Sequence, residues 1–353
     1  MKGKINYKMI TLARESRGIT QSNLAKKISN LTQGNLSRIE MGILPINETT
    51  LLSIANLLNY PIDFFYKREI QTPISNFYYR KRIMIPKRVL SQIEAQMDIV
   101  RLSIDELMNS IELPDFNFPQ IDISFKGDPA DAARKIRDYL KLPKGPIINI
   151  VNIFEKHGII VYFIDTNCEK FDGITLFTDK NQPIIFIDKK IPNDRKRFTL
   201  GHELGHLVMH IPFVIDNFRN EEEEANSFSS EFNMPYLECR NDIINLKYND
   251  LGKLKSYWKL SKAAIIVRAK QLKLITEEKY KYLMIELGRR GERKHESGLD
   301  VDIDEPTLIP QMIKIFKNNL NYNTEEISAI LGLSISDFNM YFDNNYRKMR
   351  IVI

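Results

Sequence analysis

Two histidines and a glutamate form the pattern with the clearest chemistry in this sequence. His202, Glu203 and His206 read His-Glu-x-x-His within an apolar-periodic run that predicts a partly buried amphipathic helix. Residues at i and i+4 share one face of a helix, so the two imidazoles can bind one metal ion. Glu203 would lie beside the first ligand, within reach of a water on that metal. The arrangement suits zinc, with Glu203 as the general base of a peptide-cleaving site.

Histidine is rare in this chain, which makes the pattern specific. Three of the 5 histidines fall in this run, and the third is His210, one turn further along. The alternative is an ordinary helix with two surface histidines, because short motifs also match by chance. A catalytic zinc ion takes three protein ligands, and the third is expected to be a carboxylate. His210 is therefore interpreted as hydrogen-bond support for a ligand, or as a surface residue, rather than as an extra ligand.

A run of four glutamates, 221–224, offers the third ligand. It opens a second predicted helix, which ends before Pro235. Glu222 and Asn226 are four residues apart and share a face, so Glu222 is the predicted ligand and Asn226 its hydrogen-bond support. The other glutamates are expected to form a solvated first turn whose charge complements the helix dipole. Sequence alone leaves the choice among the four open.

These residues resemble the ImmA/IrrE family of zinc metallopeptidases. The resemblance rests on the histidine motif, the preceding Arg197-Phe-Thr-Leu200, the strand-like stretch 183–188, and Glu-x-x-Ala-Asn-x-Phe followed by Met-Pro at 222–235. Gly201 is one departure, since alanine is more common there, and it costs the helix about 1 kcal/mol. The others are Ser229, Ser230 and Asn233, where small apolar residues and leucine are usual.

The resemblance implies a set of roles for this chain. His202, His206 and Glu222 would be zinc ligands, and Glu203 the base. Members of the family typically act in the cytoplasm and cleave a helix-turn-helix repressor, which releases stress or mobile-element genes. A repressor-type protein, or the chain itself, is thus the expected substrate.

The first 68 residues form a second recognisable module. Short apolar-periodic segments begin after Thr20 and Thr32, which are suited to helix N-caps, and Gly18 separates the second helix from the one before it. A fourth helix is predicted over 49–58. This pattern resembles the Xre/lambda-repressor helix-turn-helix family over 5–66. The alternatives are a helical bundle with polar surface residues and a protein-binding module of the same shape, because fold alone does not fix function.

In a helix-turn-helix the third helix enters the major groove of double-stranded DNA. Glutamine and asparagine can pair with adenine and arginine with guanine, while other polar groups contact phosphate. The expected DNA contacts are Gln33, Asn35 and Arg38 on base edges or phosphates, with Gln21, Ser37 and Thr32 setting the register.

Charge supports a nucleic-acid partner for the first module. Residues 1–68 carry ten Lys or Arg and four Asp or Glu, a surplus equal to the net charge of +6 of all 353 residues. Two distant cysteines imply no disulfide framework, and no apolar run approaches the length of a membrane span. The first residues lack the apolar segment of a signal peptide. We therefore expect a cytoplasmic protein that does not bind membranes.

The expected fold is α+β. It starts with an all-α helix-turn-helix domain at 1–68 and a helical linker at 69–128. A peptidase domain of the zincin type follows at 129–290, with helices on a small antiparallel sheet whose edge strand is 183–188. A helical extension, 291–353, ends the chain, and its last helix pair is interpreted as a docking hairpin.

Two functions are compatible with these patterns. The first is a DNA-associated zinc endopeptidase and transcriptional regulator. The second is a non-proteolytic helix-turn-helix repressor or antitoxin-like regulator whose zinc domain senses or scaffolds. The intact motif favours the first, because a structural zinc site has no use for Glu203. A homodimer is expected only by analogy with repressors that bind two half-sites.

Overall fold

The computed structural model describes residues 4–68, 85–124, 127–213, 215, 218–293, 296 and 300–343. The chain forms two compact units. One contains residues 1–114, 176–184 and 307–353, and the other contains 115–175 and 185–306. The predicted boundaries between four domains stay a prediction, and part of the predicted linker, 69–84, lies outside the described residues. No helix in the described part of the chain is long and apolar enough to cross a membrane.

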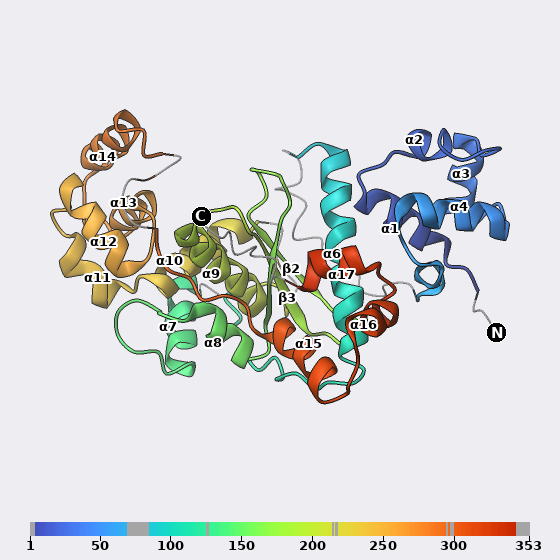
Figure 1. Cartoon of the computed structure of the whole chain (residues 1–353). Coiled ribbons are helices and arrows are strands. Elements are labelled where there is room, and N and C mark those ends of the chain that lie inside the picture. The colour runs from blue at the N-terminus through green and yellow to red at the C-terminus, as the bar shows by residue number, and fades with distance from the viewer. Residues whose placement is uncertain are drawn as a thin grey trace, which may run out of the picture. The chain divides into compact units, whose positions relative to one another are not determined.

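The first unit begins with the predicted helix-turn-helix, drawn in blue in Figure 1. The side chains of Thr20, Thr32 and Asn47 each accept a hydrogen bond from the backbone N–H three residues on, which starts the second, third and fourth helices. Apolar residues of every helix face a common core. The elements are α1 (Tyr7–Ser16), α2 (Gln21–Ala25), α3 (Gln33–Glu40), α4 (Glu48–Leu58) and the 3-10 helix η1 (Ile62–Tyr66).

A long helix, α6 (Lys87–Leu107), packs against α1. Two of its charged residues, Arg101 and Asp105, are 2% exposed. Both contact the backbone of the 176–184 hairpin: Arg101 donates to the carbonyl of Phe177 at 3.3 Å, and Asp105 accepts from the N–H of Asp179 at 3.1 Å. The helix therefore belongs to the core of this unit.

The C-terminal helices also belong to the first unit. They are α15 (Leu308–Asn318), α16 (Thr324–Leu331) and α17 (Ile335–Phe342), and Gly332 turns the chain between the last two at a φ of +68°. The guanidinium of Arg17 in the helix-turn-helix pairs with both carboxylate oxygens of Asp337 at 2.8 and 2.6 Å. The first turn of α17 is thus engaged with the helix-turn-helix itself, which agrees with the predicted docking hairpin.

The sheet has the order β1-β3-β2 and is mixed, so the expectation of an antiparallel sheet was wrong in this detail. Its strands are β1 (Ile160–Ile164), β2 (Gly173–Phe177) and β3 (Pro183–Asp188). A hairpin joins β2 to β3, and its turn puts β3 in the centre. The expectation that 183–188 is the edge strand was also wrong, because chain order alone does not show that a third strand will insert between the first two.

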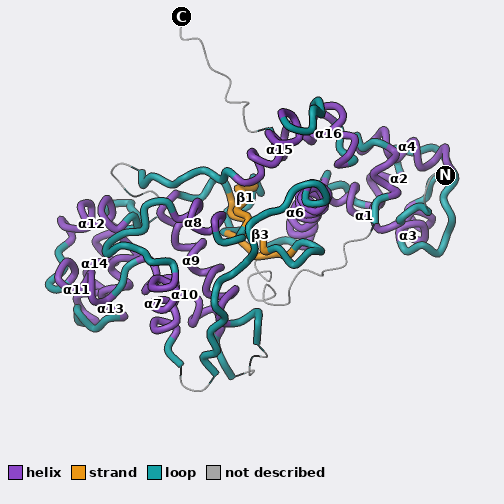
Figure 2. The backbone as a smooth tube through the Cα atoms, turned by 90° about the horizontal axis from the view of Figure 1, so that it is seen from below, coloured by secondary structure: helices purple, strands orange, loops and turns teal. Residues whose placement is uncertain are grey.

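Helices complete the second unit, and Figure 2 shows α8 and α9 beside the strands and α11 to α14 gathered further from them. α10 contacts both α7 and α9, and α8 contacts β1. The last four helices share an apolar core that includes Trp258, at the end of α12. The next helix, Lys262–Gln271, starts after Ser261, which caps it. The elements are α7 (Pro129–Tyr139), α8 (Ile150–Lys156), α9 (Asn193–Met209), α10 (Glu221–Asn233), α11 (Tyr236–Ile243), η3 (Tyr248–Asp250), α12 (Leu251–Trp258), α13 (Lys262–Gln271) and α14 (Glu277–Arg289).

Replacing Asp337 by alanine is expected to destabilise the first unit by about 1.5–3 kcal/mol, because the half-buried Arg17 loses two charge-assisted hydrogen bonds. Arg17 keeps its hydrogen bond to the carbonyl of Leu58 and its place over the ring of Tyr60, which limits the loss. Thermal denaturation of the full chain measures the effect.

Amide hydrogen exchange locates the destabilised region, and faster exchange is expected in residues 7–16 and 335–342 of the Asp337→Ala protein. The control is Asp63→Ala, which removes an exposed carboxylate from the same unit and should change stability by less than about 0.5 kcal/mol. Equal behaviour of the two variants would contradict the prediction.

Candidate metal centre

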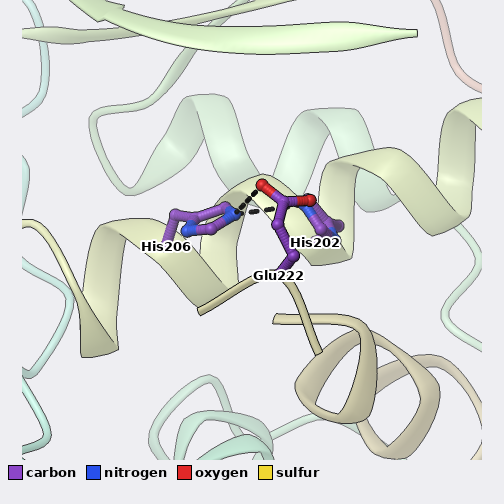
Figure 3. A group of neighbouring side chains, drawn as sticks. All are labelled: His202, His206 and Glu222. Carbon is purple, nitrogen blue, oxygen red and sulfur yellow. Dashed lines mark hydrogen bonds and ion pairs between the residues drawn. The ribbon is translucent and has the colours of Figure 1, made fainter. Parts of the chain in front are cut away.

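The histidine motif lies on α9, the most buried helix around the sheet. His202 and His206 are 4% and 6% exposed, and their Nε2 atoms are 3.1 Å apart. Glu222, in the first turn of α10, reaches both of them: its Oε2 lies 3.6 Å from Nε2 of His202 and its Oε1 lies 3.7 Å from Nε2 of His206. Figure 3 shows the carboxylate facing the two rings from the neighbouring helix.

These distances fit a single zinc ion. Two nitrogen ligands about 2.0–2.1 Å from a tetrahedral zinc lie about 3.3–3.4 Å apart, close to the observed separation of the three donors. Nδ1 of His202 lies 3.0 Å from Oδ1 of Asn226, which can only accept. His202 therefore carries its proton on Nδ1 and presents the lone pair of Nε2 to the cluster. Two nitrogens and a carboxylate are the donor set of a catalytic zinc site with one position left for a reactant.

Glu203 follows His202 on α9, and its carboxylate contacts a residue of the sheet. It is 4% exposed, and its Oε2 accepts a hydrogen bond of 2.7 Å from the hydroxyl of Thr175 on β2. Thr175 is also buried, so the strand fixes the position of this carboxylate. No local pattern pointed to Thr175, because 28 residues separate it from Glu203 and only the fold brings the two together.

A chain of polar residues leads away from His206 on the other side. Nδ1 of His210 lies 2.8 Å from Nδ1 of His206, and Nε2 of His210 lies 2.9 Å from Oε2 of Glu224. Arg219 holds both oxygens of Glu224, at 3.0 and 2.7 Å. Burial lowers the pKa of His210. Burial opposes ionisation of Glu224, but hydrogen bonds from Arg219 and His210 outweigh it and lower the pKa of this carboxyl.

The four glutamates of α10 thus have different environments. Glu222 faces the two histidines, Glu224 contacts His210, and Glu223 is exposed and bonds the side chain of Asn220. Glu221 lies near His206 and His210. A solvated first turn therefore describes Glu223 and does not describe Glu224, whose partner lies on another helix and gave no local signal.

Close approach of α9 and α10 brings these groups together. A Cβ at Gly201 would lie 2.7 Å from Nδ2 of Asn233 and 2.8 Å from Oγ of Ser229, and one at Gly205 would touch the ring of Phe228 at 3.2 Å. The amide of Asn233 and the hydroxyl of Ser229 occupy the space that an alanine side chain at 201 would need. Two departures from the family's usual residues therefore explain each other.

The structure also places the predicted DNA contacts. Gln33, Asn35 and Arg38 are exposed on α3, and Ser37 is half-buried. The amide of Gln33 donates to Oε1 of Gln21. The amide nitrogen Nε2 of Gln21 donates in turn to Glu40 at 2.8 Å. The oxygen of Thr32 accepts from the N–H of Asn35 and caps the helix, which is a structural role.

Gly201→Ala is expected to destabilise the second unit by about 1–3 kcal/mol, because the new methyl group overlaps α10. Helix propensity acts in the opposite direction by up to about 1 kcal/mol. The matched control is Gly252→Ala in α12, where a Cβ would meet no atom within 4 Å and a gain of about 0.5–1 kcal/mol is expected. Denaturant unfolding of both variants measures the difference, and a stabilised Gly201→Ala protein would refute the overlap.

Comparison with known protein families supports both modules. Residues 154–270 match the family model of the IrrE N-terminal-like domain, a peptidase family, and residues 10–65 match the helix-turn-helix model. The search of curated proteins found no match. The two resemblances predicted from the sequence are confirmed. The chain therefore joins a helix-turn-helix domain to an IrrE N-terminal-like domain.

Proposed function

We propose that this protein is a DNA-binding, zinc-dependent endopeptidase that cleaves a repressor-type protein, or itself, to control stress or mobile-element genes. One observation carries the proposal. Two imidazole Nε2 atoms and the carboxylate of Glu222 converge within 3.7 Å, and Glu203, the residue after His202 on α9, is anchored separately by Thr175. A structural zinc site has four protein ligands and has no use for a further carboxylate that does not bind the metal.

Each residue has a defined role in this proposal. His202, His206 and Glu222 hold the zinc ion, and Asn226 orients His202. When bound, zinc would polarise the scissile carbonyl and lower the pKa of a water molecule. Glu203 takes the proton from the attacking water and returns it to the leaving amine. Thr175 keeps the carboxylate of Glu203 in position between these two steps.

A donor for the oxyanion is expected in such a site, and neither His210 nor Tyr162 is placed to act as one. Both ring nitrogens of His210 contact His206 and Glu224. Tyr162 is buried on β1 against the ring of Phe186. The donor for the oxyanion is therefore not assigned to either residue.

DNA binding is proposed for the exposed face of α3. Gln33, Asn35 and Arg38 read bases or phosphates, while Gln21 is held by Glu40 and orients Gln33. The target protein is proposed from the family resemblance, and the cytoplasmic location and the homodimer stay predictions. A non-proteolytic regulator remains the alternative, and the following tests separate the two.

The first test is metal content measured by elemental analysis. The wild type is expected to hold about one zinc per chain, and His202→Ala is expected to lose it with the fold intact. Glu203→Gln should retain zinc and reduce cleavage by about 10²–10⁴-fold, because only the proton acceptor is lost.

Cleavage is measured by labelling new protein N-termini after a cell extract is incubated with either protein. New N-termini formed by the wild type alone support the enzyme. Bound zinc without new N-termini would favour the non-proteolytic regulator. Absence of metal from a folded wild type would refute the zinc site.

The second test concerns DNA. A sequence enriched from a random duplex pool by the wild type should bind Arg38→Ala about 1–3 kcal/mol more weakly, because a base or phosphate contact is lost. Lys253→Ala removes the same charge from an exposed position on α12 and should leave the affinity unchanged. Failure to enrich any sequence, or equal affinities of the two variants, would contradict this role of α3.

A further inference from the structure

We propose that Arg219, Glu224 and His210 form a hydrogen-bonded relay that fixes the proton of His206 on Nδ1 and so presents its Nε2 lone pair to zinc. His210 is a positioning residue in this proposal and is not a ligand. The inference rests on the proposed function, because it assumes that His206 binds the metal. It adds three residues that the metal cluster itself does not contain.

The relay is a continuous path of contacts that ends at two buried histidines. Arg219 approaches both oxygens of Glu224, Glu224 contacts Nε2 of His210 at 2.9 Å, and Nδ1 of His210 contacts Nδ1 of His206 at 2.8 Å. His210 is 0% exposed. The contact between His210 and Glu224 joins the end of α9 to the start of α10, and Arg219 lies in the segment before α10. The metal ligands come from these same two helices.

The chemistry of the partners decides where the protons lie. An ionised carboxylate only accepts, so Nε2 of His210 donates to Glu224. With Nε2 of His206 facing His202 and Glu222 as a metal ligand, that ring keeps its proton on Nδ1, 2.8 Å from Nδ1 of His210. A neutral His210 accepts at Nδ1, and the proton between the two rings therefore belongs to His206. This leaves the lone pair of His206 on Nε2, 3.1 Å from Nε2 of His202.

The two histidine ligands then present lone pairs to each other. His202 is set by Asn226, and His206 is set by the relay. Two facing lone pairs repel unless a cation lies between them, so the outer hydrogen bonds prepare the pair for a metal before it arrives. Outer partners of this kind typically change metal affinity by about 10–100-fold.

A second metal site is the competing interpretation, since His206, His210 and Glu221 also lie close together. The distance argues against it. Two nitrogen ligands of one zinc lie about 3.3–3.4 Å apart, whereas the two Nδ1 atoms lie 2.8 Å apart, the length of a hydrogen bond. One nitrogen of His206 thus serves the metal and the other serves the relay.

The experiment compares zinc affinity among variants of the full chain at one fixed pH. Apo-protein is titrated in competition with a chromophoric chelator, and the melting temperature of the apo-protein reports folding. His210→Leu fills the space without an acceptor, whereas His210→Asn places an oxygen where Nδ1 stood. Glu224→Gln weakens the relay at its charged end. Glu223→Gln removes the same charge one residue away, where the side chain is exposed, and is the matched control.

We expect His210→Leu to bind zinc about 10–100-fold more weakly, His210→Asn to recover most of that loss, and Glu224→Gln to lie between them. Glu223→Gln should match the wild type. The same order is expected for cobalt(II), whose visible spectrum reports tetrahedral coordination directly.

Wild-type affinity in His210→Leu would overturn the relay while leaving the zinc site intact. Equal losses in His210→Leu and His210→Asn would overturn the assigned direction of the hydrogen bond. If His210→Leu does not fold, the comparison of Glu224→Gln with Glu223→Gln decides alone, and equal affinities overturn the relay. A wild type without zinc would remove the proposed function and the relay together.

Discussion

The close approach of α9 and α10 is the constraint on which the metal cluster depends. Gly201 and Gly205 place no side chain of α9 at these two positions, so Asn233, Ser229 and the ring of Phe228 on α10 pack against the backbone of α9. Glu222 then comes within bonding range of two histidines on the other helix. A larger separation would leave two imidazoles and a distant carboxylate, because a side chain of glutamate extends only a few ångströms.

The same approach explains the buried polar groups between the helices. The hydroxyl of Ser229 donates to the carbonyl of Phe198 at 2.6 Å, and Asn233 donates back to Ser229. Ser229 and Asn233 are buried polar residues in the contact between the two helices, and both have hydrogen-bond partners. Without these partners, burying them would destabilise the fold. Packing and hydrogen bonding both act to hold the two halves of the metal centre at a fixed distance.

The first unit depends on contacts that are equally distant in the sequence. Arg17 follows α1, lies over the ring of Tyr60 and pairs with Asp337, 320 residues later. Its fork of donors is satisfied by two backbone carbonyls and one carboxylate. α3, the helix proposed to contact DNA, takes no part in this pairing, and its polar residues Gln33, Asn35 and Arg38 are exposed. The C-terminal hairpin is thus a part of the domain that carries the proposed DNA-binding face.

The sequence by itself determined the local features. Caps at Thr20 and Thr32, periodic apolar residues and the i, i+4 spacing of His202 and His206 set the helices and the face of each side chain, because these depend on neighbours within one turn. Glu222 and Asn226 were predicted for the same reason. Tertiary structure alone decided which strand became central, that Thr175 holds Glu203, that Glu224 reaches His210, and that Gly201 makes room for Asn233. Each of these depends on the distance between separate elements, which is set by the packing of the whole domain and has no period in the sequence.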